Sequence, residues 1–228
     1  MNDLQTARNQ VLLQIQHACQ HAKRSETEVQ LLAVSKTQES ACLRQMYEAG
    51  QRSFGENYLQ EAMDKIENLA DLDIEWHFIG HVQRNKTKHL AEKFSWVHGV
   101  DRLVIAERLS NQRPEQYPAL NICLQVNIDA QESKDGCQPE EVAHLVAQIS
   151  RLPHLKLRGL MVIPAPNNVD AFAQAKQLFD TVKSEHAQPE QWDTLSMGMS
   201  ADLQQAISAG STMVRIGTAL FGARDYTK

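Results

Sequence analysis

Lys36 is the residue whose type and position best suit it to chemistry. It follows the apolar run Leu31–Ser35, which is typical of a buried strand. An amine in partly desolvated surroundings has a lowered pKa, so more of it is a free nucleophile that can form a Schiff base with an aldehyde. Taken alone, this segment is explained more simply by a solvated lysine just past the end of a strand, so the interpretation depends on the rest of the chain.

Two segments near the carboxyl end of the chain could hold a phosphate group. In Leu195–Asp202, Ser200 follows a glycine-containing turn and is expected to begin a helix, where backbone N–H groups and the helix dipole favour an anion. In Val214–Gly222, Gly217 allows a ligand to approach the backbone closely, and Thr218 adds a hydroxyl. Each segment alone is typical of an ordinary helix cap or turn. Because the two segments occur together, a phosphate site is as good an interpretation as an ordinary helix cap and an ordinary turn.

These residues must be positioned by a chain in which short apolar runs alternate with amphipathic helical patterns. The predicted strands are Val29–Ser35, Ser53–Gly55, Glu75–Gly80, Trp96–Gly99, Asn121–Ile128, Leu155–Val162, Thr194–Ser196 and Met213–Ile216. The predicted helices are Ser40–Ala49, Tyr58–Leu69, Lys86–Lys93, Asp101–Gln112, Pro139–Arg151, Val169–Glu185 and Ala201–Ala209, with an extra helix, Leu4–Ala22, before the first strand. This alternation predicts an α/β fold, a parallel (β/α)8 or TIM barrel. An open doubly wound sheet is the alternative, but its G-x-G-x-x-G turn is missing here.

In a barrel of this kind the carboxyl ends of the strands converge on the active site. The residues at these ends include Lys36, Asn57, His81, Asn127, Met161 and Ser196. Because the first and eighth strands of a closed barrel are neighbours, an aldehyde-binding lysine and a phosphate cradle would lie side by side. An aldehyde and a phosphate on one small molecule describe pyridoxal 5′-phosphate (PLP). They also describe the substrate of a Schiff-base aldolase that acts on a sugar phosphate.

Length and composition suit a single domain spanning residues 1–228. Hydrophobic residues make up 42% of the chain, charged residues 22%, and the net charge is −5. The net charge argues against general binding to nucleic acid or to anionic membranes. The four cysteines, Cys19, Cys42, Cys123 and Cys137, form no C-x-x-C pair, and the sequence shows neither a secretory signal nor a membrane-spanning run. We therefore expect a cytoplasmic protein with reduced thiols.

Seven short motifs follow one another along the chain: Leu32–Thr37, Phe54–Tyr58, Trp76–Gly80, Gln83–Lys86, Gly159–Met161, Leu195–Ser200 and Val214–Gly217. Together they resemble the YggS/PROSC family of PLP homeostasis proteins. The resemblance runs from about Val29 to Tyr226, nearly the whole chain. It implies a barrel similar to the N-terminal domain of alanine racemase, the PLP fold of type III.

The resemblance also implies how the cofactor is held. Lys36 would hold PLP as a Schiff base, Ser200 would bind the phosphate together with the Gly217 and Thr218 backbone, and Arg215 would face the pyridine nitrogen. The remaining pocket would be lined by Asn57, His81, Met161 and Ser196. No residue is assigned a catalytic role, and no metal is expected.

The implied function is to buffer PLP and deliver it to apo-enzymes. The sequence does not fix the oligomeric state, and a monomer is expected because no second domain is seen. A guanidinium that donates to the ring nitrogen leaves that nitrogen unprotonated, which weakens PLP as an electron sink. The second acid–base group of alanine racemase is a tyrosine from another domain and a partner subunit. None of the four tyrosines here, Tyr47, Tyr58, Tyr117 and Tyr226, lies in a segment suited to that role. A PLP-dependent amino-acid racemase is the alternative function.

Other signals carry less weight. His77 and His81 have the spacing of a helical zinc site but are expected to flank a strand, where four residues span roughly 13 Å. The basic cluster formed by Arg84, Lys86 and Lys88 could bind RNA, although it lacks interleaved aromatic residues. Lys134 matches a lysine that the family carries after the fifth strand, and is a candidate secondary acceptor of PLP. Gln38 stands where some relatives have a second lysine, so a relay between neighbouring amines is not expected.

Overall fold

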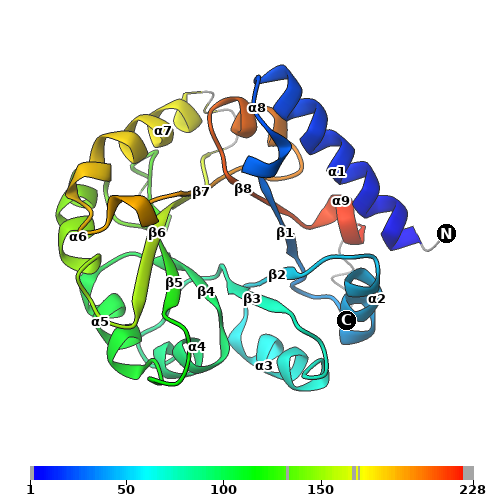
Figure 1. Cartoon of the computed structure of the whole chain (residues 1–228), viewed down its shortest axis with the longest axis horizontal. Coiled ribbons are helices and arrows are strands. Elements are labelled where there is room, and N and C mark those ends of the chain that lie inside the picture. The colour runs from blue at the N-terminus through cyan, green and yellow to red at the C-terminus, as the bar shows by residue number, and fades with distance from the viewer. Residues whose placement is uncertain (1–2, 132–133, 166–167, 169, 223–228) are drawn as a thin grey trace.

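Eight parallel strands lie side by side in chain order within residues 3–131, 134–165, 168 and 170–222, which the computed structural model describes. The first strand pairs with the eighth, from Gln30 opposite Met213 to Ala33 opposite Ile216, and this closes the barrel (Figure 1). The strands are β1 (Gln30–Val34), β2 (Ser53–Glu56), β3 (Glu75–Phe78), β4 (Trp96–Val100), β5 (Leu120–Val126), β6 (Leu155–Val162), β7 (Thr194–Ser196) and β8 (Met213–Ile216). The predicted barrel is confirmed.

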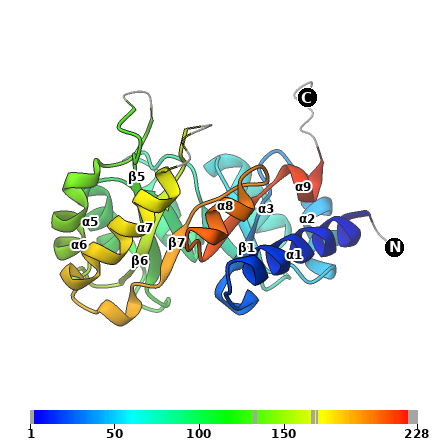
Figure 2. The same ribbon diagram turned by 90° about the horizontal axis from the view of Figure 1, so that it is seen from above.

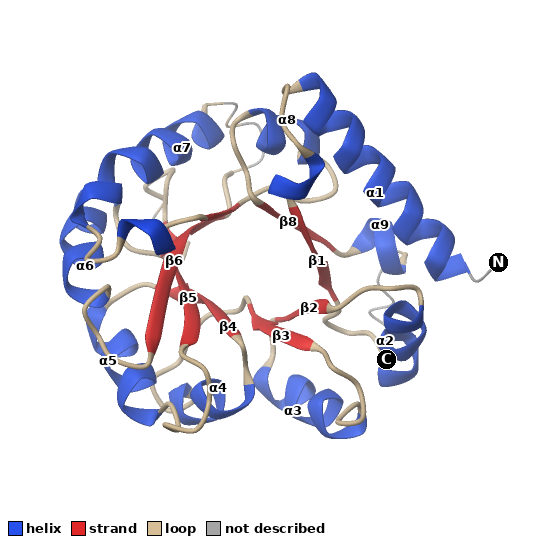
Figure 3. Cartoon of the chain, in the orientation of Figure 1, coloured by secondary structure: helices blue, strands red, loops and turns tan. Residues whose placement is uncertain are grey.

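Helices form an outer ring around the strands (Figure 3). They are α1 (Asp3–His21), α2 (Ser40–Glu48), α3 (Leu59–Asn68), α4 (Thr87–Lys93), α5 (Leu103–Gln112), α6 (Val142–Ile149), α7 (Ala171–Thr181), α8 (Leu203–Ser208) and α9 (Thr218–Phe221), with short 3-10 turns at Glu26–Glu28, Pro139–Glu141, Val182–Glu185 and Pro189–Gln191. No helix among the described residues is both long and apolar enough to cross a membrane.

The extra N-terminal helix, α1, packs along the outside of the barrel. It contacts α8 and α9, beside the junction of the first and last strands (Figures 1 and 2). Val11, Ile15 and Ala18, which the sequence places on one face, are buried in this contact. The helix therefore covers the seam where the barrel closes.

The apolar core has two layers. The larger layer lies between the strands and the surrounding helices. A smaller cluster inside the barrel consists of Leu32, Trp96, Cys123, Met161 and Met213. Because side chains alternate along a strand, β1, β4, β5, β6 and β8 contribute to both layers. The filled interior leaves space for a ligand only at an end of the barrel.

Some predicted boundaries differ from the structure at the carboxyl end of the chain. The helix predicted to begin at Ala201 begins at Leu203, because the Asp202 carboxylate accepts the Met199 N–H at 2.5 Å and closes a separate turn before it. The short helix α9 has no counterpart among the predicted elements. Val169, where the seventh helix was predicted to begin, lies outside the described residues.

Candidate functional site

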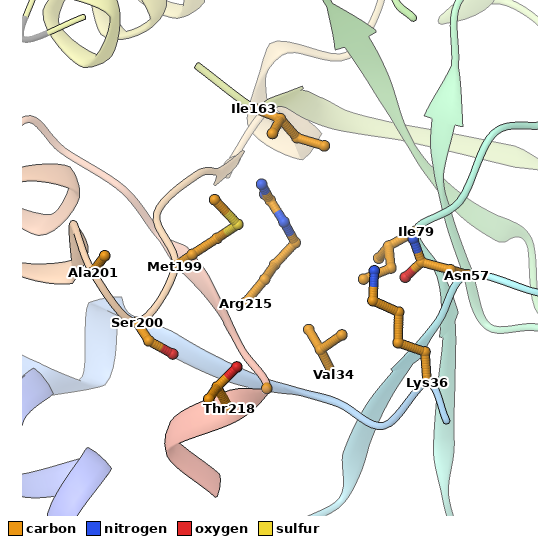
Figure 4. A pocket seen from close by; sticks show the side chains of 11 residues that line it. Val34, Lys36, Asn57, Ile79, Ile163, Met199, Ser200, Ala201, Arg215 and Thr218 are labelled. Carbon is orange, nitrogen blue, oxygen red and sulfur yellow. The ribbon is translucent and has the colours of Figure 1, made fainter. Parts of the chain in front are cut away.

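A cavity of about 280 Å³ opens at the carboxyl ends of the strands. This is close to the lower limit of small-molecule pockets in proteins. The side chains that line it come from the ends of β1, β2, β3, β6 and β8 and from the turn before α8 (Figure 4): Val34, Lys36, Asn57, Ile79, Ile163, Met199, Ser200, Ala201, Arg215, Gly217 and Thr218. Six of the nine predicted cofactor residues therefore lie together.

Lys36 and Asn57 form one side of the cavity. Lys36 lies two residues after the end of β1 and Asn57 directly follows β2, so the pairing of these neighbouring strands brings the two side chains together (Figure 4). Lys36 is half-buried. The Asn57 carbonyl oxygen Oδ1 is buried and accepts no hydrogen bond from any described residue. A buried acceptor without a donor is unfavourable, so this atom is suited to receive a donor from a ligand.

Arg215 projects from β8 toward the middle of the cavity (Figure 4). Its Nη1 donates to the Ser196 carbonyl at 2.7 Å and to the Ser196 hydroxyl at 2.8 Å, and its Nη2 donates to the Val162 carbonyl at 2.9 Å. Burial lowers the pKa of Arg215 to about 10, so the guanidinium stays protonated at neutral pH. No carboxylate among the described residues forms an ion pair with it. Its charge is available to a ligand.

Two backbone turns form the opposite side of the cavity, where Ser200 and Thr218 lie (Figure 4). Among the described residues, the backbone N–H groups of Ser200, Ala201, Gly217 and Thr218 donate no hydrogen bond to another protein atom. A Cβ on Gly217 would approach the Val34 carbonyl to 3.2 Å, so glycine keeps this corner uncrowded. Hydroxyl and backbone N–H groups together are suited to a phosphate.

Three predicted residues lie outside the lining of the cavity. His81 stands on the exposed rim, where its Nδ1 is 3.1 Å from Asp135 Oδ1. Met161 points into the barrel core instead, because of its position in the alternation of β6. Ser196 is fully buried beneath Arg215 and orients that guanidinium. Their part in cofactor binding stays a prediction.

Sequence reasoning missed most of the apolar lining. Val34, Ile79 and Ile163 end or directly follow strands, as the predicted polar residues do. Position at a strand end was therefore the signal that could have found them. Met199, in the turn before α8, also lies in the lining, with 41% of its surface exposed.

Lys134 lies near the cavity, and its ammonium group already contacts two oxygen atoms of the protein. Its Nζ is 2.9 Å from Asp129 Oδ2 and donates to the Ile163 carbonyl at 3.0 Å. Glu132 and Ser133, in the same loop, lie outside the described residues. No group of three or more potential metal ligands occurs in the part of the chain that the structure describes.

Comparison with known proteins identifies the family. The family model for the alanine racemase N-terminal domain matches residues 11–225. A pyridoxal phosphate homeostasis protein of Pasteurella multocida is 53% identical over 227 residues, which cover 96% of this chain and 97% of the relative. One from Escherichia coli K12 is 48% identical over 233 residues and covers all of both chains. The chain belongs to the family of pyridoxal phosphate homeostasis proteins.

Solved structures agree with membership of the pyridoxal phosphate homeostasis proteins. PipY of Synechococcus elongatus with PLP bound is 40% identical, with a TM-score of 0.75 over 86% of this chain and 93% of that one. Alanine racemase of Corynebacterium glutamicum has a TM-score of 0.65 at 14% identity, over 93% of this chain and 62% of that one, and shares the fold alone. The predicted family and its racemase-like barrel are confirmed.

Proposed function

We propose that this chain binds PLP in the cavity and serves to buffer the cofactor and deliver it to apo-enzymes. The observation that carries the proposal is the convergence of a lysine, an unpartnered buried acceptor, an arginine and a hydroxyl-lined turn on one cavity of about 280 Å³. The family's name and the PLP-bound PipY relative support the same ligand. The site is proposed to work in a cytoplasmic monomer formed by one domain.

Each functional group of PLP has a chemically matched partner in the lining. In this proposal Lys36 Nζ binds the aldehyde carbon, and Asn57 Oδ1 accepts a hydrogen bond from the ring hydroxyl. Arg215 donates to the ring nitrogen, while Ser200 and the Gly217–Thr218 backbone hold the phosphate. His81, Met161 and Ser196 complete the proposed site from outside the lining, Ser196 by orienting Arg215 through its carbonyl and hydroxyl.

The proposed role is that of a carrier without strong catalysis. Bound PLP supplies an electron sink for carbanions, and its strength depends on protonation of the ring nitrogen. Arg215 remains a cation at neutral pH and can only donate, so it keeps that nitrogen unprotonated. The relatives named as homeostasis proteins support this assignment over the racemase alternative.

Substitution Lys36→Ala tests the proposal directly. The wild-type protein, incubated with PLP and desalted, is expected to keep an imine absorption band, and borohydride reduction followed by peptide mass spectrometry should find the adduct on Lys36. Lys36→Ala should lose both the band and the adduct. Lys134→Ala is the matched control among lysines near the cavity, and is expected to keep both. An adduct on another lysine, or none in the wild type, would refute the proposed site.

A further inference from the structure

Helix α3 holds the backbone on both sides of Lys36. The Lys65 ammonium donates to the Ser35 carbonyl at 2.7 Å, directly before Lys36. The Glu61 carboxylate accepts the Thr37 N–H at 2.6 Å, directly after it. Lys65 and Glu61 are four residues apart on α3 and pair with each other at 2.5 Å. Two contacts from one helix therefore bracket the lysine that faces the cavity.

The bracket is anchored in the interior through β2. Glu56, the last residue of that strand, is fully buried, and its Oε1 lies 2.8 Å from Lys65 Nζ. The same oxygen accepts the Ser35 hydroxyl at 2.6 Å. Lys65 itself is only 4% exposed. Because buried charges are costly unless they are paired and hydrogen-bonded, this network admits few alternative arrangements.

Thr37 shows what the bracket holds in place. Its φ of 67° lies in the left-handed region, which a β-branched residue adopts only at an energetic cost. The hydrogen bond from Thr37 N–H to Glu61 is therefore formed on a strained turn. Without that acceptor, the turn is free to relax, and the direction in which the neighbouring Lys36 side chain leaves the backbone changes with it.

We propose that Glu61 and Lys65 are positioning residues that aim the Lys36 amine at the aldehyde of PLP. The inference rests on the proposed function, since it concerns the same attachment. On attachment the neutral Lys36 amine would form a double bond from its nitrogen to the aldehyde carbon, and the aldehyde oxygen would leave as water with the two hydrogens of the amine. Correct aim favours this step over non-covalent binding, which depends on the phosphate and ring contacts at the opposite side of the cavity.

A matched pair of substitutions at Glu61 separates positioning from charge. Glu61→Gln keeps an oxygen for the Thr37 N–H and for Lys65, whereas Glu61→Ala removes it. The ratio of covalently attached to non-covalently bound PLP follows from the imine absorbance and from total binding in equilibrium dialysis. This ratio is expected to fall about tenfold in Glu61→Ala, the loss expected when a hydrogen bond to a charged group is removed. In Glu61→Gln the ratio should stay within about twofold of the wild-type value. Glu67→Ala, exposed on the same helix, is the control and should not change it.

Lys65→Met provides an independent second variant, with thermal unfolding measured beside the ratio. A lowered ratio in a protein that remains folded supports positioning. A lowered melting temperature with an unchanged ratio in both Glu61→Ala and Lys65→Met would overturn the inference and leave a purely structural network. If the wild type forms no imine at all, the proposed function fails instead, so the two failures are distinguishable.

Discussion

At the scale of single residues, Asn57 differs from an ordinary buried polar side chain. Its Oδ1 is buried without a donor among the described residues, and the residue lines the cavity. An unsatisfied buried acceptor costs about 1–3 kcal/mol, which a bound ligand recovers when it donates to that atom. A residue of this kind stabilises the complex at the expense of the unliganded protein.

Substitution Asn57→Leu should therefore act in opposite directions on stability and on binding. We expect the unliganded protein to be unchanged or up to about 1 kcal/mol more stable to urea, while affinity for PLP falls about tenfold. Gln112→Leu is the control, because Gln112 Oε1 is also buried without a partner but lies at the end of α5, away from the cavity. It should share the effect on stability and leave PLP affinity unchanged. A marked loss of stability in Asn57→Leu would contradict this account of the residue.

At the scale of elements, strand order and the polar residues after the strands were predictable from the sequence. Lys36 and Asn57 were identified because alternating strands and helices imply a barrel whose strand ends meet. Arg215 was identified only through the resemblance to the family. The start of α8 was not predictable from the sequence. Asp202 accepts a hydrogen bond from the Met199 N–H and closes a turn before the helix, and such a contact does not change the hydrophobic periodicity. The apolar lining was missed for a related reason, since the side a strand-end residue faces depends on the register between strands.

A second polar network occupies the amino ends of β2, β3 and β4, away from the cavity. Glu75 accepts hydrogen bonds from the Ser53 hydroxyl at 2.9 Å and from Trp96 Nε1 at 3.1 Å, and His77 Nε2 lies 3.0 Å from it. His77 Nε2 donates to the Glu75 carboxylate, and His77 Nδ1 lies 3.0 Å from His98 Nε2. Burial lowers the pKa of His77. The network joins three strands at the end of the barrel where stability, not chemistry, is decided.

Glu75 gives this network a dependence on pH. Burial alone would raise its pKa, but the hydrogen bond and the charge of His77, together with hydrogen bonds from Ser53 and Trp96, outweigh burial and lower it to about 2. The unfolded carboxyl, with a pKa near 4.5, takes up its proton first as the pH falls. Stability from Glu75 is therefore complete above about pH 4.5 and is lost as the pH falls toward 2.

Unfolding in urea between pH 5 and pH 2 should reveal this contribution. Wild-type stability is expected to decline over that interval, and Glu75→Gln should show a shallower decline because it has no proton to take up. Asp73→Asn, at a neighbouring exposed position, is the control and should follow the wild type. Parallel curves for the wild type and Glu75→Gln would contradict the assigned role.

At the scale of the whole molecule, the racemase-like barrel accounts for residues 11–225 of the chain. This chain spans 62% of the Corynebacterium glutamicum alanine racemase, whereas it covers 97% of the Pasteurella multocida homeostasis protein. Racemisation needs acid–base groups on both faces of the cofactor, and the proposed attachment would make Lys36 one of them. Of the four tyrosines, Tyr47, Tyr58 and Tyr117 lie outside the cavity lining, and Tyr226 lies outside the described residues.

Amino-acid turnover by the PLP-loaded protein is accordingly expected to stay near that of free PLP. With L- or D-alanine in D2O, proton NMR should show α-proton exchange no faster than with an equal concentration of free PLP. An unprotonated ring nitrogen stabilises the carbanion poorly, and no tyrosine among the described residues lines the cavity to return the proton. PLP with Lys36→Ala is the control for exchange that does not require the site. One positioned acid–base group contributes at least about a hundredfold in rate. If the PLP-loaded protein converted the enantiomers about a hundredfold faster than free PLP does, it would be a racemase.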